Sequence, residues 1–329
     1  MKKVLFISST GGHLNELLQL SPLFEKYDYY IITEKDVTNE YLQEKYEGKV
    51  EYLPYGTRSH LFTYIFVYFY LILKTIFLYF KIRPKVIVTT GTHTAGPMCY
   101  LGKLFGSKII YIETYANINR KTATGRLIYP IADLFIVQWE EMLNIYPKAV
   151  YGGQIFKWIV KKAIILGGFV MILVLLGTQN NQFTRLLQEI EKCIENGTIN
   201  QRVVVQAGFT KYKSDKMHIF DLKPKEVIDN LVDEANFIIT HGGVGSILMA
   251  IKKNKKVIAV PRLSEFNEHV NDHQRQIVEI FNDKNYIIGI QTMEDLADAI
   301  KQIDDFNPVP YSGDNSKMLN IIESFIDKC

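Results

Sequence analysis

The chain has 329 residues, 47% of them hydrophobic, and a formal net charge of +3. This length suggests two domains, and the hydrophobic content is sufficient for two ordinary cores. The charge is too small to indicate a nucleic-acid partner. The three cysteines, Cys99, Cys193 and Cys329, form no close pair, which argues against a disulfide framework or a thiolate zinc site and suits a reducing cytosol.

The first half of the chain alternates short apolar runs with helical patterns, which is typical of parallel α/β sheets. We predict strands at residues 3–8, 29–33, 50–52, 85–89, 108–112 and 134–139. The first strand leads into Thr10, Gly11, Gly12 and His13, a strand-to-helix turn whose backbone N–H groups suit a phosphate. His13 is therefore either a capping or packing residue, or an acid, base or phosphate ligand.

Two further positions of the first half are predicted to face a ligand. Small residues around Thr92 follow the strand at 85–89 and leave room for one. Glu113 follows the strand at 108–112, and a carboxylate at the carboxyl end of a strand points into the crevice of an open α/β sheet. The alternative for Glu113 is an ion pair with Arg120 or Arg126.

The run that begins at Leu61 and covers residues 61–80 is dominated by phenylalanine and tyrosine. Its length of about 20 residues would allow it to span a membrane. Spanning is disfavoured because the strands on both sides of the run belong to one sheet. The alternatives are a core helix and a helix docked in the membrane interface, which the tyrosine hydroxyls favour. Anionic headgroups would then meet the basic residues Lys74, Lys81, Arg83 and Lys85.

Gly152 and Gly153 mark a domain boundary. We predict a first domain at residues 1–152, a linker at 153–170 and a second domain at 171–329. The apolar and basic stretch at 157–169 is either a linker helix or a second contact with a membrane surface, and the sequence leaves both open.

The second half restarts the alternation of strands and helices at Met171. Strands are predicted at 171–176, 202–206, 217–220, 237–239 and 257–260. The predicted fold class is therefore α/β, with two Rossmann-like domains that face each other across a cleft.

The stretch 240–246 carries most of the functional information. It lies between a buried strand end and the apolar face of a helix, where glycine lets a phosphate approach the backbone and the helix dipole favours an anion. The alternative is a turn selected only for its backbone angles. A polar run at 265–274 follows the next strand and can hydrogen-bond a sugar, which favours a nucleotide-sugar site.

These motifs resemble known families. The second half is similar to the catalytic half of GT-B glycosyltransferases related to the peptidoglycan GlcNAc transferase that makes lipid II, and closer still to the catalytic subunit of the two-subunit GlcNAc transferase of N-glycan precursor assembly. The first half resembles that enzyme's membrane-docking subunit. Residues 265–274 look most like bacterial capsule and exopolysaccharide β-1,4-galactosyltransferases, which use the same two pieces. The matching segments are 10–13, 111–113, 124–127, 132–139, 177–178, 241–246 and 273–274.

The chain departs from these families in two respects. Both halves are on one polypeptide, with Met171 where a separate catalytic subunit would start, and the sequence does not say whether this fusion is natural or engineered. The opening loop of the second half often reads Gly-Thr-His in the family, whereas here it reads Gly177-Thr178-Gln179. Any role of that histidine is lost or moved.

The resemblance implies an inverting glycosyltransferase that moves a hexose from a UDP-sugar to a polyprenyl-diphosphate-linked sugar. Galactose in β-1,4 linkage, for capsule or exopolysaccharide repeat units, is the favoured hexose, and GlcNAc is the alternative. The implied donor-binding residues are Gly177, Thr178, Gln206, Gly208, His241, Gly242, Gly243, Val244, Gly245, Ser246, Glu268, His269, Asp272 and Gln274. The implied acceptor-binding residues are Thr10, Gly11, Gly12, Thr92 and Asn117.

Inversion by direct displacement needs a base on the acceptor hydroxyl, and the candidates are Glu113, which we favour slightly, and His13. The sequence contains no Asp-x-Asp, so we expect neither a metal nor another cofactor, and the helix at 244 would stabilise the leaving UDP. Through residues 61–80 the protein would be a peripheral or monotopic protein at the cytoplasmic face of the plasma membrane.

Three other functions are alternatives to this one. A UDP-sugar 2-epimerase shares the two-domain form but acts on a soluble substrate and has no use for residues 61–80. A dehydrogenase is excluded because neither the first strand nor the strand at 171–176 is followed by Gly-x-Gly-x-x-Gly. A non-catalytic membrane scaffold for a partner transferase would not need the glycine loop at 242–245.

Overall fold

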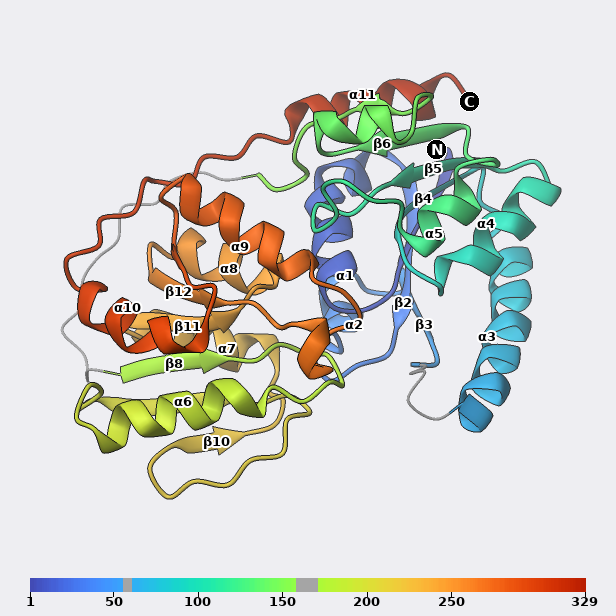
Figure 1. Ribbon diagram of the computed structural model, residues 1–329. Helices are drawn as coiled ribbons and strands as arrows, with labels where there is room; N and C mark the ends of the chain where they lie inside the picture. Colours follow the sequence, from blue (N-terminus) through green and yellow to red (C-terminus); the bar gives the residue numbers. More distant parts are fainter. Residues whose placement is uncertain (56–60, 158–170) are drawn as a thin grey trace. The chain divides into compact units, whose positions relative to one another are not determined.

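The computed structural model describes residues 1–55, 61–157 and 171–329, and for residues 61–65 it describes the backbone only. The chain forms two compact units (Figure 1). The first contains Met1–Lys157 together with Gly313–Cys329, and the second contains Trp158–Ser312. Each unit is built on one parallel sheet with helices between its strands, so the predicted pair of Rossmann-like domains is confirmed.

The first unit has a seven-stranded sheet in the order β3-β2-β1-β4-β5-β6-β7. Its strands are β1 (Lys3–Ser8), β2 (Asp28–Glu34), β3 (Val50–Leu53), β4 (Val86–Gly91), β5 (Lys108–Ile112), β6 (Leu134–Val137) and β7 (Val150–Tyr151). Its helical segments are α1 (Gly12–Leu17), η1 (Leu18–Lys26), α2 (Tyr41–Lys45), α3 (Leu61–Ile82), α4 (Ala95–Leu104), α5 (Ala123–Ile128), η2 (Glu140–Asn144) and α11 (Ser316–Asp327).

The second unit has a six-stranded sheet in the order β10-β9-β8-β11-β12-β13. Its strands are β8 (Met171–Leu175), β9 (Arg202–Gln206), β10 (His218–Phe220), β11 (Phe237–His241), β12 (Lys256–Val260) and β13 (Ile288–Gly289). Its helical segments are α6 (Thr184–Glu195), α7 (Lys225–Glu234), α8 (Val244–Lys252), η3 (Ser264–Phe266), α9 (His273–Asp283), η4 (Met293–Asp295) and α10 (Leu296–Gln302).

The central strands are continuous apolar runs because helices cover both faces of a parallel sheet. All five residues of β8 are buried, as are all six of β4. The strand order reverses direction between β1 and β4 in the first unit and between β8 and β11 in the second. Ligands of open α/β sheets bind beyond the carboxyl ends of the strands at such a switch point. Each unit therefore has one position where a ligand site is expected.

Helix α3 has two different faces. Leu71, Leu78 and Ile82 are buried against the first unit, where α3 packs on α4 and β3. Its opposite face exposes large hydrophobic side chains to solvent: Phe66, Phe69, Tyr70, Leu73, Ile76, Phe77 and Phe80. An ordinary core helix would bury these side chains, so the arrangement agrees better with the interfacial alternative. Among the described residues, no helix combines the length and the apolarity that crossing a bilayer requires.

The C-terminal helix α11 belongs to the first unit, whereas the sequence placed residues 313–329 in the second domain. Its apolar face buries Met318, Ile322 and Ile326. Its polar face is held by Lys26, which pairs with Glu323 at 2.6 Å, and by the hydroxyl of Tyr27, which donates to Asp327 at 2.8 Å. The amphipathic pattern predicts a helix here but does not indicate which of two sheets the helix covers.

The first unit also extends past its predicted end at residue 152. Ile155 and Phe156 are buried, and the backbone N–H of Ile155 donates to the side chain of Gln138 at 2.8 Å. The remainder of the predicted linker, residues 158–170, lies outside the described residues, and so does most of the stretch 157–169.

We expect Ile322→Ala to destabilise the first unit by about 2–5 kcal/mol, because the change opens a cavity beneath α11 in a fully buried position. Urea unfolding of the full chain, followed by limited proteolysis to locate the loosened unit, measures this. Ser324→Ala on the exposed face of the same helix is the matched control and should change stability by about 0.5 kcal/mol or less. Equal effects of both changes would contradict the assignment of α11 to the first unit's core.

Candidate active site

Loops that follow β8, β9 and β11 meet closely in the second unit. A Cβ atom added to Gly208 would lie 2.3 Å from the backbone oxygen of Gly177. Cβ atoms added to Gly177 or Gly243 would lie 2.6 Å and 2.3 Å from the imidazole Nε2 of His241. Such distances exclude any side chain, and Gly177 and Gly208 also have positive φ angles of 79° and 61°. These three loops can therefore pack this closely only because the three positions are glycines.

The imidazole of His241 is the centre of this arrangement. Its Nδ1 lies 3.2 Å from the carbonyl oxygen of Leu175, so the proton is assigned to Nδ1, which donates to that oxygen. Burial, with a further contribution from the charge of Arg262, lowers the His241 pKa to about 3. The ring is therefore neutral at pH 7, with Nε2 left as an acceptor. It positions the glycine loops rather than supplying charge to a phosphate.

Helix α8 begins where these loops meet. Gly243 precedes its first residue, and no side chain caps the first turn. Gly243, Gly245 and Ser246 are partly exposed, so the start of the helix is reachable. The first N–H groups of a helix lack intrahelical partners and carry its positive dipole end, which together favour an anion such as a diphosphate.

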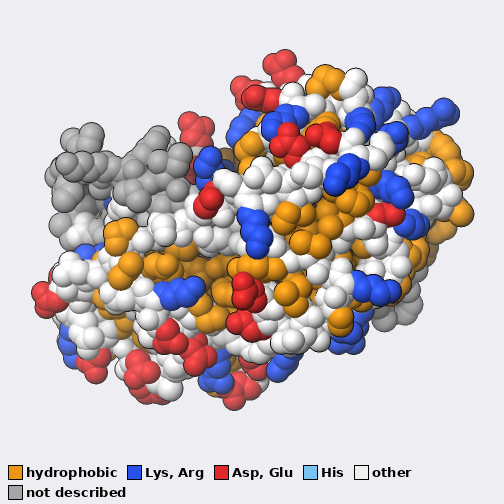
Figure 2. Space-filling model, turned by 90° about the horizontal axis from the view of Figure 1, so that it is seen from above, with side chains coloured by type: hydrophobic (Ala, Val, Ile, Leu, Met, Phe, Trp, Pro, Cys, Tyr) orange, Lys and Arg blue, Asp and Glu red, His pale blue; other side chains and the backbone are white. Residues whose placement is uncertain are grey.

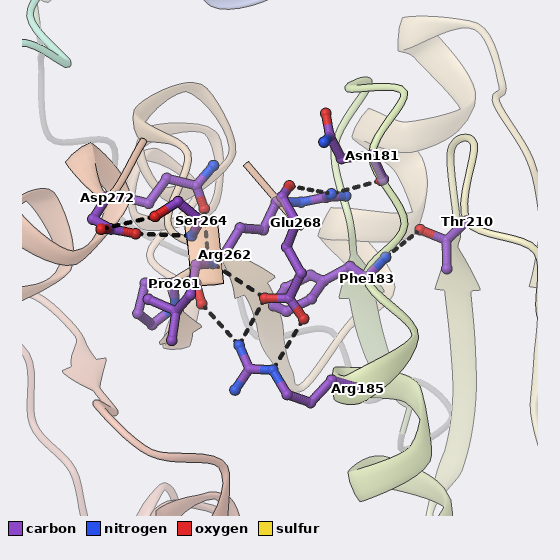
Figure 3. Close-up of polar contacts among 11 residues, drawn as sticks. Asn181, Phe183, Arg185, Thr210, Pro261, Arg262, Ser264, Glu268 and Asp272 are labelled. Carbon is purple, nitrogen blue, oxygen red and sulfur yellow. Dashed lines mark hydrogen bonds and ion pairs between the residues drawn. The ribbon is translucent and has the colours of Figure 1, made fainter. Parts of the chain in front are cut away.

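A partly buried ion pair supports the loop after β12 (Figure 3). Arg185 on α6 binds Glu268 with two hydrogen bonds, from Nε at 3.0 Å and from Nη2 at 2.8 Å. The backbone N–H of Leu263 donates to the same carboxylate at 3.1 Å. Glu268 was expected at the donor sugar, but its carboxylate is buried and engaged by these partners, so it holds the loop at 261–268 in place.

Arg262 is a functional candidate that the sequence reasoning did not name. It is fully buried, and its guanidinium donates to the backbone oxygens of Asn181 at 2.7 Å, Leu176 at 2.7 Å and Glu268 at 3.2 Å (Figure 3). Burial lowers its pKa to about 10, so it stays charged at pH 7. The signal in the sequence was a basic residue directly after β12 and Pro261, at a strand's carboxyl end.

The remaining polar residues of the run 265–274 mostly bind this loop. The side-chain oxygen of Gln274 accepts from the backbone N–H of Arg262 at 3.0 Å. Asp272 accepts from the N–H and the hydroxyl of Ser264 at 2.8 and 3.0 Å. His269 contacts Gln179, the residue that replaces the family's histidine, at 2.9 Å. Gln206 is buried at the end of β9, and Thr178 is half-buried after β8.

The switch point of the first unit brings His13 and Thr92 together. Nδ1 of His13 lies 2.7 Å from the carbonyl oxygen of Thr90, whose hydroxyl donates to the backbone oxygen of His13 at 2.8 Å. The hydroxyl of Thr92 donates to that of Ser9 at 3.1 Å. The predicted loop at 10–13 and Thr92 therefore lie together at the carboxyl ends of β1 and β4. Burial, with a smaller contribution from His93, lowers the His13 pKa.

Glu34 and His93 extend this cluster, and neither was predicted. The buried carboxylate of Glu34 accepts from the hydroxyl of Thr94, and its Oε1 lies 3.3 Å from Nε2 of His93. Asn39 links the cluster to the glycine loop, since its amide donates to the hydroxyl of Thr10 at 3.2 Å and to the backbone oxygen of Glu34 at 2.7 Å. Burial raises the Glu34 pKa to about 7.

Glu113 lies in a separate buried cluster. Its carboxylate accepts from the hydroxyls of Thr122 and Tyr146, each at 3.0 Å, and from the N–H of Thr114 at 3.2 Å. A Cβ atom on Gly125 would lie 2.4 Å from its Oε2. The side chain is 1% exposed and its partners are hydroxyls and an amide, so neither predicted environment, an open crevice or a pairing arginine, is found.

Asn117 belongs with Glu113 and not with the acceptor loop. It is buried, and its amide donates to the backbone oxygen of Arg120. The resemblance implied an acceptor contact for Asn117, whereas its side chain is enclosed beside Glu113. Among the described residues, no group of three histidine, cysteine, aspartate or glutamate side chains is arranged to hold a metal ion.

Two family descriptions divide the chain near the boundary of the two units, although the second description includes α11, which belongs to the first unit. Residues 4–155 match "Oligosaccharide biosynthesis protein Alg14 like", and residues 171–328 match the glycosyltransferase family 28 C-terminal domain. The chain resembles a GT-B glycosyltransferase with both halves on one polypeptide.

Curated relatives of this glycosyltransferase match its first half. The mouse UDP-N-acetylglucosamine transferase subunit ALG14 is 26% identical over 179 residues, which is 46% of this chain and 82% of the mouse protein. The subunit from Kluyveromyces lactis is 55% identical over 77 residues, 22% of this chain and 33% of that protein. Both relatives are named for N-acetylglucosamine, so the expectation of galactose and of a capsule linkage has no support among them.

Solved structures similar to the glycosyltransferase cover its whole length and establish the fold. MurG from Acinetobacter baumannii has a TM-score of 0.57 with 14% identity, over 98% of this chain and 100% of that chain. The UDP-GlcNAc 2-epimerase of Methanocaldococcus jannaschii, in complex with UDP-GlcNAc and UDP, has a TM-score of 0.68 with 14% identity, over 99% of both chains. Transferases and epimerases therefore share this architecture, and fold alone does not separate the two activities.

We expect the free energy of unfolding to fall as the pH rises from about 4.5 to about 7, in part because of Glu113. Burial raises the Glu113 pKa from 4.5 to about 7, so in this window the folded state holds a proton that the unfolded chain releases. Glu113→Gln should remove up to about 3 kcal/mol of this pH dependence, measured by urea unfolding across the window.

The slope will not vanish in that variant, since burial also raises the pKa of Glu16 to about 8 and that of Glu34 to about 7. Glu47→Gln, at an exposed position of the same unit, is the matched control. A wild-type slope in Glu113→Gln would show that Glu113 ionises normally in the folded protein.

Proposed function

We propose that the chain transfers N-acetylglucosamine from UDP-GlcNAc to a sugar linked to a polyprenyl diphosphate, with inversion at the anomeric carbon. The observation that carries the proposal is the bare start of α8, where the glycine loops after β8, β9 and β11 converge within a family 28 domain. The choice of N-acetylglucosamine in place of galactose is supported by the names of the relatives of the first half.

The donor diphosphate would lie at the start of α8, against Gly242, Gly243 and Gly245. The helix dipole and the backbone N–H groups stabilise the negative charge that UDP gains as it leaves, without rearrangement during the reaction. Arg262 adds a fixed positive charge beneath the loops after β8 and β12. Since this arrangement supplies the positive field that a cation supplies in other transferases, we propose that no metal is needed.

His13 is the better candidate for the base. With the proton on Nδ1, which donates to Thr90, its Nε2 carries a lone pair. Nε2 takes the proton from the acceptor hydroxyl while that oxygen attacks the anomeric carbon, the bond from that carbon to the UDP oxygen breaks, and UDP leaves with the electron pair. Glu113, favoured from sequence, is 1% exposed with both carboxylate oxygens engaged, so we now assign it a structural role.

The exposed face of α3 supports peripheral docking on a membrane. Phe69 and Phe77 are 61% and 64% exposed, and aromatic side chains of this kind insert at the headgroup level. The basic residues next to this face contribute less to binding anionic headgroups than the sequence predicted, because Lys81 is paired with Glu51 at 2.6 Å. We propose that this face holds the protein at the cytoplasmic side of the plasma membrane, where the lipid acceptor is presented.

A panel of radiolabelled UDP-sugars with a synthetic glucosyl-diphosphate-lipid acceptor tests the donor. We expect transfer from UDP-GlcNAc, weaker or no transfer from UDP-galactose and UDP-glucose, and an unchanged rate in EDTA. Consumption of UDP-GlcNAc without acceptor would indicate the epimerase activity whose fold this chain shares. Transfer from UDP-galactose alone would restore the galactose hypothesis.

We expect His13→Ala to lower kcat by about 100- to 10,000-fold, the range for loss of a positioned general base, with little change in KM for UDP-GlcNAc. Glu113→Gln should keep most of the wild-type kcat. The rate should be level through neutral pH and fall only below pH 6.5, because burial lowers the His13 pKa from that value and the base must be neutral. A folded Glu113→Gln protein as inactive as His13→Ala would return the role to Glu113.

A further inference from the structure

An apolar groove of about 810 Å³ lies between α3, α4 and α5 in the first unit. Its walls include Ile72 on α3, Leu101 and Leu104 on α4, and Leu127 on α5. Among the described residues that line it, His93 is the only one whose side chain can carry a charge at neutral pH, and it lies at the polar cluster with Glu34. The groove therefore pairs one ionisable position with a largely apolar lining.

The groove is held open in the structure. The hydroxyl of Tyr100 on α4 donates to the backbone oxygen of Leu127 on α5 at 2.9 Å, which fixes the spacing of two walls. A Cβ atom on Gly96 would meet no atom within 4 Å, so the absence of a side chain there leaves open space. Leu104 and Leu127 are 76% and 59% exposed, far more than leucine side chains in a core.

The groove begins where the candidate acceptor site ends. His93 follows Thr92 directly, and Thr92 contacts Ser9 at the mouth of the loop that carries His13. On its other side the groove is lined by α3, whose outer face carries the exposed aromatic side chains. Figure 2 shows hydrophobic side chains gathered on the surface of the first unit, in the right part of the view, flanked by lysine and arginine side chains.

We infer that this groove binds the first isoprene units of the lipid acceptor, with the diphosphate at the His93 end. The inference rests on the proposed function, because the acceptor there has a charged head that must reach His13 and an apolar tail that must leave the site. The polar end of the groove suits the charged head of the acceptor, and the uncharged, preformed apolar channel beyond it suits the tail. Two alternatives, a tail lying on the outer face of α3 and a second copy of the chain in the groove, are outcomes of the test below.

Binding of prenyl diphosphates to the full chain, measured by calorimetry, tests this without any need for turnover. We expect the Kd to fall along the series inorganic, dimethylallyl, geranyl and farnesyl diphosphate, by about tenfold or more over the whole series, because each added unit buries apolar surface. Gly96→Trp should abolish this dependence by filling the groove, while Gly96→Ala, the matched control, should keep it. Leu127→Lys, at an exposed position that the fold tolerates, should weaken farnesyl diphosphate binding in the same way.

Phe77→Ser separates the groove from the outer face of α3, because Phe77 is exposed on that helix and does not line the groove. It should weaken binding to anionic vesicles and leave farnesyl diphosphate binding unchanged. Farnesyl diphosphate binding lost in Phe77→Ser but kept in Gly96→Trp would place the tail on the outer face and overturn the inference. So would a wild-type Kd that is independent of tail length, or self-association that Gly96→Trp abolishes with no effect on prenyl diphosphates.

Failure of the proposed function has a different signature. If no UDP-sugar is transferred to any acceptor while binding still depends on tail length, the groove stands and the reaction is wrong. If transfer to an acceptor with a short, water-soluble tail proceeds equally in wild type and Gly96→Trp, and only the long-tailed acceptor loses kcat/KM in the variant, both proposals hold.

Discussion

The imidazole of His241 occupies space that side chains at 177 and 243 would otherwise fill, and this close approach organises the second unit. The carbonyl of Leu175 orients the ring, and burial keeps it neutral. Since neither glycine carries a Cβ, the loops after β8 and β11 both pack directly against the ring. Gly208 allows the loop after β9 to pack against the backbone of the loop after β8. No side chain caps the start of α8, and Gly243, Gly245 and Ser246 are partly exposed there, so a diphosphate can reach the backbone.

The first unit uses buried carboxyl groups for a similar purpose. Glu16 receives hydrogen bonds from Thr114, Tyr115 and Gln138, and thereby ties α1 to the loop after β5 and to the end of β6. Glu34 and Glu113 hold other loops at the same edge of the sheet. Burial raises the pKa of all three, so each favours the protonated form more than an exposed carboxyl group does. A raised pKa at a strand end thus reflects support of a loop as readily as catalysis.

The side chains of helix α3 face three different surroundings. Its inner face is anchored by Leu71 and Leu78, its outer face presents aromatic side chains, and one of its edges lines the apolar groove. A single helix can therefore serve a membrane surface and a lipid tail because its residues divide among three directions around the helix axis. An isolated reading of its composition could not separate these uses, since all three require apolar residues.

The sequence by itself determined the two-domain α/β architecture, because alternating apolar strands and helices permit few other arrangements, and it located both glycine loops at strand ends. It could not assign α11, since an amphipathic helix fits either sheet and only packing against η1 decides. It named Glu113 and Glu268 as ligand contacts, because a carboxylate at a strand end looks the same in sequence whether it faces a crevice or is enclosed by Thr122 and Tyr146 or by Arg185. It missed Arg262, Glu34 and His93, whose partners are distant along the chain and meet only when parallel strands bring their carboxyl ends to one edge.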